Sequence, residues 1–158
     1  MSITVPVYVK KTFEVEYSGE EVFKILSDVP NSVSHFPNIS RIDNIGKNAF
    51  QWEMKKSVVA SLNIETVYSC NYSYNKDEGW VKWNSRQING GGKMDVKWVI
   101  DPKKGATKIE FSSDGMLEIP LSSIFKLIVT PLVISEFENM VDKYIENLSI
   151  IIRECCKN

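Results

Sequence analysis

The chain has 158 residues, with 19 basic and 20 acidic side chains and a formal net charge of −1. This length predicts one domain over residues 1–158, and the balanced charge argues against the basic surface that nucleic-acid binding requires. Its three cysteines are an odd number and two of them are adjacent, which argues against a disulfide framework. No apolar run is long enough to span a bilayer, and none near the start resembles a secretory signal, so we expect a cytoplasmic protein.

The first part of the chain predicts a strand followed by two short helices. Apolar and polar residues alternate over residues 5–17, as in a strand with one buried face. Ser18 then suits a helix N-cap, because two glutamates stand in the turn after it, where the helix dipole favours carboxylates. A second short helix is predicted over residues 29–36, where Pro37 would end it.

Six further strands follow without a linker or repeat. Turn signals separate them, for example Gly46-Lys47-Asn48 and Asp101-Pro102-Lys103-Lys104-Gly105, in which Pro102 suits the second position of a tight turn. Alternation within each strand gives the sheet one apolar face. The predicted strands cover residues 39–45, 49–56, 62–74, 80–87, 93–101 and 107–117.

The last long apolar run of the chain covers residues 121–154, and a long amphipathic helix is predicted within it. From Phe137 onward its apolar residues recur at steps of three and four, and charged residues take the opposite face. A single such helix after a run of strands buries its stripe on the sheet, so the predicted fold class is α+β. The stripe consists of Phe137, Met140, Val141, Tyr144, Ile145, Leu148, Ile151 and Ile152.

The opening of the chain carries a further signature, in which residues 18–28 lead into Phe36-Pro37 and then into the strand at 39–45. Together with the order of one strand, two short helices, six strands and one long helix, this resembles the helix-grip fold of the START-like, or SRPBCC, superfamily. That superfamily includes polyketide cyclase/dehydrase, coenzyme Q-binding and birch-pollen-allergen-like proteins. The resemblance covers essentially the whole chain and concerns architecture, without a catalytic fingerprint.

The resemblance implies a curved antiparallel sheet of about seven strands wrapped around the C-terminal helix, with a hydrophobic cavity between them. Members use that cavity to carry lipids, quinones or sterols, and some fold aromatic polyketides in it. We therefore expect this chain to bind a hydrophobic or amphipathic small molecule as a carrier or sensor. Two alternatives remain open: an aromatase/cyclase-type enzyme that works by holding a reactive chain in shape, and a protein that docks on a membrane or a partner.

The candidate ligand-binding residues are mainly aromatic and sulfur-containing side chains on the predicted inward face. Each alone is most often ordinary core, but together they favour an apolar cavity with a few polar groups, of roughly a few hundred Å³. Arg86 would bind a carboxylate, phosphate or carbonyl oxygen of a ligand if it turned inward, although a charge on a strand usually faces solvent. The candidates are Trp52, Met54, Tyr68, Tyr72, Trp83, Arg86, Trp98, Phe111, Phe137, Met140 and Tyr144.

The sequence offers little for catalysis or metal binding. His35 is the only histidine and has no partner ligand nearby, so neither a metal nor another cofactor is predicted. Cys70 falls on the inward face, where a small buried thiol is usual, and no histidine is placed to activate it. We therefore expect no acid–base pair inside the cavity.

Residues 116–134 are the least ordinary stretch, because they are apolar on almost every side. Such a stretch suits a lid over the cavity mouth, a membrane contact or a dimer contact. Thr130-Pro131 fits either a helix N-cap with proline at the first helical position or a kink in one long helix. We expect this segment to gate the cavity and to touch a membrane or a partner transiently, and the oligomeric state stays open.

Overall fold

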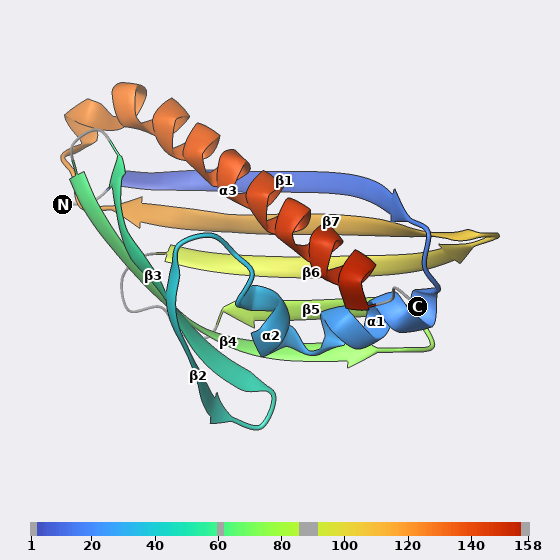
Figure 1. Ribbon diagram of the computed structural model, residues 1–158. Coiled ribbons are helices and arrows are strands. Elements are labelled where there is room, and N and C mark those ends of the chain that lie inside the picture. The colour runs from blue at the N-terminus through green and yellow to red at the C-terminus, as the bar shows by residue number, and fades with distance from the viewer. Residues whose placement is uncertain (1–2, 60–61, 86–91, 156–158) are drawn as a thin grey trace.

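The computed structural model describes the backbone at residues 3–59, 62–85 and 92–155, and the side chains there except at 55–59 and 62–66. Seven antiparallel strands form one sheet, and a long C-terminal helix lies on it (Figure 1). The predicted α+β helix-grip fold is confirmed. The strands are β1 (Ile3–Val15), β2 (Ile39–Gly46), β3 (Ala49–Val59), β4 (Leu62–Asn75), β5 (Trp80–Ser85), β6 (Gly92–Lys103) and β7 (Ala106–Ile119). The helices are α1 (Gly19–Ser27), α2 (Val29–Val33), the 3₁₀ helix η1 (Ser123–Phe125) and α3 (Lys126–Cys155).

The strand order across the sheet is β1-β7-β6-β5-β4-β3-β2, so the first and the last strand are neighbours. From β2 to β7 the chain is a meander in which each strand pairs antiparallel with the next. Because β1 and β2 lie at opposite edges, the chain has to cross the sheet between them, and α1 and α2 make that crossing. In Figure 1, α3 runs obliquely over β1, β7 and β6, and its C-terminal end comes close to α1.

The core lies between α3 and the face of the sheet that it covers. Side chains along the first half of β1 alternate between buried and solvent-facing, as the two-residue period of a strand requires. The apolar stripe predicted for α3 meets them, and each fully buried aliphatic side chain contributes about 1.5–3 kcal/mol relative to exposure. The buried side chains of α3 are Val129, Val133, Val141, Tyr144, Leu148 and Ile152.

Ser18 is the N-cap of helix α1, as predicted. The Ser18 hydroxyl accepts a hydrogen bond from the backbone N–H of Glu21 at 3.2 Å, and the Ser18 N–H donates to the Glu21 carboxylate at 3.3 Å. The pair forms a capping box, which satisfies two backbone donors at the helix start. Helix α2 follows directly, with Pro30 in its first turn, so the two helices form a bent bridge beside the core.

The hairpin between β6 and β7 is tighter than the sequence predicted. Its turn is Lys104-Gly105, and Gly105 has a φ of +77° that glycine adopts without strain. Pro102 was expected inside the turn but lies in β6, where it pairs with Thr107. A proline is tolerated there because the pairing of β6 with β5 has already ended at Val99.

Helix α3 is continuous from Lys126 to Cys155, so Pro131 lies inside it. This excludes the interpretation of Thr130-Pro131 as a helix start and leaves that of a proline within one long helix. Because proline has no N–H, the carbonyl of Leu127 lacks its usual partner four residues later. Neither α3 nor another helix in the described part of the chain has the length and apolar character needed to cross a membrane.

Candidate ligand-binding site

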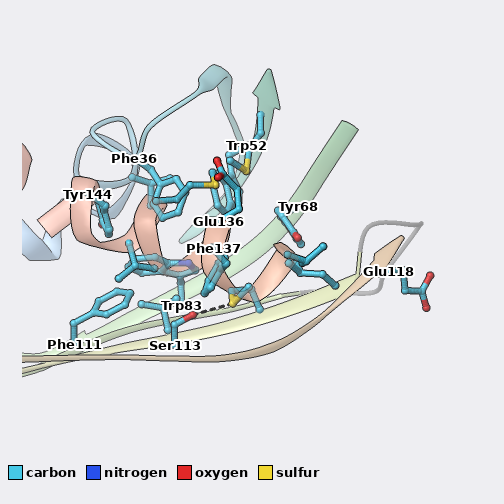
Figure 2. Close-up of a pocket in the computed structure, with 18 of the residues that line it drawn as sticks. Phe36, Trp52, Tyr68, Trp83, Phe111, Ser113, Glu118, Glu136, Phe137 and Tyr144 are labelled. Carbon is cyan, nitrogen blue, oxygen red and sulfur yellow. Dashed lines mark hydrogen bonds between the residues drawn. The ribbon is translucent and has the colours of Figure 1, made fainter. Parts of the chain in front are cut away.

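A cavity of about 80 Å³ lies between α3 and the sheet. Strands β3 to β7 form one wall, α3 forms the opposite wall, and Val33 and Phe36 from α2 and the loop after it close one side (Figure 2). Alternation sends every second side chain of each strand to this face, and the apolar stripe of α3 faces them. The predicted space between helix and sheet therefore exists.

Eight of the candidate residues line this cavity. Those from the strands come from β3, β4, β5 and β7, and those from the helix lie one to two turns apart on α3, so residues far apart in the sequence meet at one place. That they bind a ligand stays a prediction. The eight are Trp52, Met54, Tyr68, Trp83, Phe111, Phe137, Met140 and Tyr144.

Three candidates do not line it in the described structure. Trp98 is fully buried beside it, with its ring centroid 4.7 Å from that of Phe111 and 6.0 Å from that of Tyr144. Tyr72 is half-buried and packs on Phe50 instead, at 6.0 Å between centroids. Arg86 lies outside the described residues. Alternation placed Trp98 and Tyr72 on the correct face, but not at the correct distance along the sheet.

The cavity is smaller than the few hundred Å³ that the sequence led us to expect, and that expectation was wrong. Aromatic rings fill the missing space: the Phe36 centroid lies 5.5 Å from that of Trp52 and 5.1 Å from that of Tyr144, and the Trp52 centroid lies 5.1 Å from that of Tyr68. Sites for drug-sized ligands usually measure about 300–1,000 Å³. A ligand of that size needs these rings or α3 to move.

Phe36 is one of the lining residues that were not among the candidates. It was used only as part of the family signature, although Val29, Val33 and Phe36 recur at helical spacing and all three are buried. That spacing was the signal that could have placed Phe36 on the inward side, in line with the buried residues of α2.

The polar groups near the cavity are few, and most of them are paired. The hydroxyls of Ser32 and Tyr144 are hydrogen-bonded at 2.8 Å, which joins α2 to α3 inside the core. Burial raises the pKa of the Tyr144 hydroxyl, while the hydrogen bond with Ser32 and the nearby indole of Trp98 oppose the rise. Burial also raises the pKa of Tyr68, so both phenols stay protonated near neutral pH. The Ser113 hydroxyl donates to the sulfur of Met94 at 2.9 Å.

The expected inert thiol and the lone histidine both lie away from the cavity wall. Burial raises the pKa of Cys70 to about 12, although Trp52 and Ser85 would stabilise a thiolate there, so the group is a poor nucleophile. His35 is half-buried, and its backbone carbonyl accepts a hydrogen bond from the Asn147 side chain at 2.9 Å. In the described part of the chain, no cluster of three or more His, Cys, Asp or Glu side chains could hold a metal.

Two carboxylates mark the side on which the cavity meets solvent. Glu118 at the end of β7 and Glu136 on α3 are exposed lining residues, and Figure 2 draws Glu118 at the end remote from Tyr144 and Phe111. Among the described residues, the lining includes no lysine, arginine or histidine. The charged side chains of the described lining are therefore both acidic.

An exposed apolar surface lies beside that mouth, and we call it the apolar tip. It is made by η1 and the first two turns of α3, where Leu127 is 90% exposed and Ile124 is 77% exposed. The segment 116–134 thus has two parts, since Leu117, Ile119 and Val133 line the cavity while the apolar tip faces outward. The apolar tip consists of Ile124, Phe125, Leu127, Ile128 and Leu132.

Solved structures share this architecture. A START superfamily protein from Mycobacterium smegmatis has a TM-score of 0.68 at 15% identity, over 94% of this chain and 98% of that one. The Zhui aromatase/cyclase from Streptomyces sp. R1128 has a TM-score of 0.68 at 11% identity, over 94% of each chain. A conserved protein from Geobacillus kaustophilus has a TM-score of 0.69 at 11% identity, over 93% and 95%. At these identities the likeness shows the fold alone, and the resemblance to START-like proteins is confirmed.

Sequence comparison gives the family. No curated protein matches the chain significantly. The sequence pattern of the CoxG family, whose members are described as a carbon monoxide dehydrogenase subunit, matches residues 12–152. The match includes all the described elements from α1 to β7 and nearly all of α3. The chain therefore belongs to the CoxG family.

Proposed function

We propose that this chain is a single ligand-binding domain that holds a hydrophobic or amphipathic small molecule between α3 and the sheet. The observation that carries the proposal is the apolar cavity at that place, enclosed by side chains from five strands and one long helix. Apolar walls with a few polar groups are typical of small-molecule sites. A lipid, a quinone, a sterol-like molecule or a polyketide would suit such walls.

A role as carrier or sensor is favoured over catalysis. General acid–base chemistry needs a group whose pKa lies near the working pH and which reaches the reacting atoms. Of the described lining side chains, the two phenols have raised pKa values, and the two carboxylates stand at the solvent side. A cyclase would have to work by shaping its substrate, and turnover of a model poly-β-ketone is the outcome that would favour it.

We further propose that residues 116–134 form the gate. The cavity has to enlarge before it can hold a whole ligand, and this segment supplies both part of its wall and the apolar tip outside. Pro131 weakens the helix at this point, because a helical hydrogen bond is missing. Contact of the apolar tip with a membrane would offset the cost of exposing further apolar surface, about 25 cal/mol per Å².

The test uses two variants of α3 that carry the same new side chain. Met140→Trp fills the cavity, whereas Ile150→Trp adds the same ring at an exposed position of the same helix. We expect native mass spectrometry of the wild type and of Ile150→Trp to show a bound small molecule. If the purified proteins carry none, both should bind the dye N-phenyl-1-naphthylamine saturably. Met140→Trp should lose both while its circular dichroism spectrum stays that of the wild type. A wild type without bound mass and without saturable probe binding contradicts the proposal.

A further inference from the structure

Trp83 has a buried hydrogen-bond donor without an acceptor. Its side chain is 3% exposed and lines the cavity from β5, and its indole Nε1 has no partner in the described structure. An indole N–H can only donate, so no rearrangement of its own proton relieves it. Buried donors are paired in the great majority of cases, and an unpaired one calls for an explanation such as a missing ligand.

The surroundings of Trp83 differ from those of the other three tryptophans. Trp52 and Trp98 also lack a partner for Nε1 in good geometry, but they lie near the Cys70 thiol and the Tyr144 hydroxyl, whose pKa values they influence. Trp80, on the opposite face of β5, donates to the carboxylate of Glu78 at 2.7 Å. Trp83 lines the cavity, and its buried indole Nε1 has no hydrogen-bond partner in the described structure.

The surroundings of Trp83 also favour donation. Trp83 pairs across the sheet with Val96, and Val96 pairs with Ser113, so Trp83 and Ser113 lie in one row on the floor of the cavity (Figure 2). Ser113 is fully buried, and its hydroxyl donates to the Met94 thioether, which is a weak acceptor. A ligand oxygen is a stronger acceptor than a thioether, so the Trp83 indole N–H and the Ser113 hydroxyl on this floor could donate to it.

The charged side chains of the described lining disfavour an anionic acceptor. Glu118 and Glu136 are the charged side chains of the described lining, and both are carboxylates. An anionic ligand group would pass these carboxylates and then lose its hydration, and none of the described lining residues carries a positive charge to compensate. A neutral oxygen acceptor has no such cost.

We propose that the ligand is an uncharged apolar molecule with a carbonyl oxygen, and that this oxygen accepts a hydrogen bond from Nε1 of Trp83. The inference rests on the proposed function and names the ligand class for the same cavity. Trp83 then determines specificity, because its hydrogen bond makes a ketone, quinone or ester bind more tightly than a hydrocarbon of the same shape. One hydrogen bond of this kind corresponds to a preference of about five- to tenfold.

The test uses three probes of nearly equal size: 2-acetylnaphthalene, 2-isopropylnaphthalene and 2-naphthoate. Each displaces N-phenyl-1-naphthylamine from the wild type, from Trp83→Phe and from the control Trp80→Phe, which removes a tryptophan from the outer face of the same strand. We expect the ratio of ketone to hydrocarbon affinity to fall about five- to tenfold in Trp83→Phe and to stay unchanged in Trp80→Phe. Naphthoate should bind more weakly than the ketone.

A second measurement needs only the wild type, in case Trp83→Phe fails to fold. The chain has four tryptophans, so ¹⁵N-indole labelling gives four N–H signals. The ketone should move one of them downfield and show a nuclear Overhauser contact to it, and the hydrocarbon should not.

If both neutral probes bind but no indole signal distinguishes them, the Trp83 proposal is wrong and the proposed function stands. If naphthoate binds as tightly as the ketone, the uncharged class is wrong. If no probe binds, the proposed function fails as well.

Discussion

At the scale of single residues, Tyr144 connects the parts of the core. It is fully buried, its ring lies 5.1 Å from that of Phe36 and 6.1 Å from that of Phe111, and its hydroxyl bonds Ser32. One side chain therefore joins α3 to α2, to the loop after it and to β7. The sequence placed Tyr144 on the inward stripe, but the Ser32 partner, 112 residues earlier in the chain, carried no signal in the local pattern.

Tyr144→Phe removes the phenol and leaves the buried Ser32 hydroxyl without its partner. We expect this variant to lose about 1–3 kcal/mol of unfolding free energy, the usual cost of an unsatisfied buried group. Urea denaturation followed by fluorescence measures it, with Tyr74→Phe as the control, because Tyr74 is half exposed. In the double variant with Ser32→Ala the two losses should be less than additive. A single variant within about 0.5 kcal/mol of the wild type would show that the bond contributes little.

The raised pKa of Cys70 makes stability depend on pH in the alkaline range. The folded thiol ionises at about 12, whereas the thiol of the unfolded chain ionises near 8.5. Between these values the unfolded state binds fewer protons, so the free energy of unfolding falls as pH rises from about 8.5. The urea midpoint should therefore fall more between pH 7.5 and pH 10 for the wild type than for Cys70→Ala. An equal fall in the two proteins would show that the thiol has the same pKa in the folded and the unfolded state.

At the scale of elements, most of the fold could be predicted from local pattern. The strand and helix bounds follow alternation and helical spacing, because one buried face imposes a period on each element. The distance of a side chain along the sheet has no such period, which is why Trp98 and Tyr72 were expected in the cavity. The turn at Lys104-Gly105 was missed for a related reason. Pro102 can lie inside β6 because the pairing of β6 with β5 has already ended at Val99, and this pairing has no local signal. The cavity volume depends on how rings interlock, which no spacing encodes.

The apolar tip gives a prediction for α3 and η1 as a gate. Phe125→Asp places a charge where the gate would have to touch a membrane, so it should slow uptake of pyrene from phosphatidylcholine vesicles by several-fold. Uptake by the wild type should be faster from vesicles than from dispersed solution. Tyr8→Asp is the control, since Tyr8 is 62% exposed on the outer face of β1. Equal uptake from vesicles by the wild type and Phe125→Asp would place the entrance elsewhere.

At the scale of the whole molecule, α3 is held unevenly on the sheet. The described polar contacts from α3 to other elements involve its second half: Asp142 with Lys11 at 3.1 Å, Tyr144 with Ser32 at 2.8 Å, Asn147 with the His35 carbonyl at 2.9 Å, and the Arg153 carbonyl with Tyr17 at 3.4 Å. Four of the six buried side chains of the helix also fall there. The first half contains Pro131 and the part of the apolar tip that lies in α3, and its Val133, Phe137 and Met140 line the cavity.

This asymmetry predicts which part of the molecule moves when the 80 Å³ cavity enlarges. Regions with few buried apolar contacts open at lower free energy than the core, and amide hydrogen exchange reports that opening. In the free protein, amides at residues 126–140 should therefore exchange faster than those at 141–155. Saturation with 2-acetylnaphthalene should slow exchange in the first half and leave the second half nearly unchanged, since a bound ligand stabilises the closed state. Pro131→Ala, which restores the missing donor, should slow exchange in the first half without any ligand. Uniform exchange along α3 in the free protein would contradict a gate built from its first half, and the cavity would then have to enlarge through the sheet.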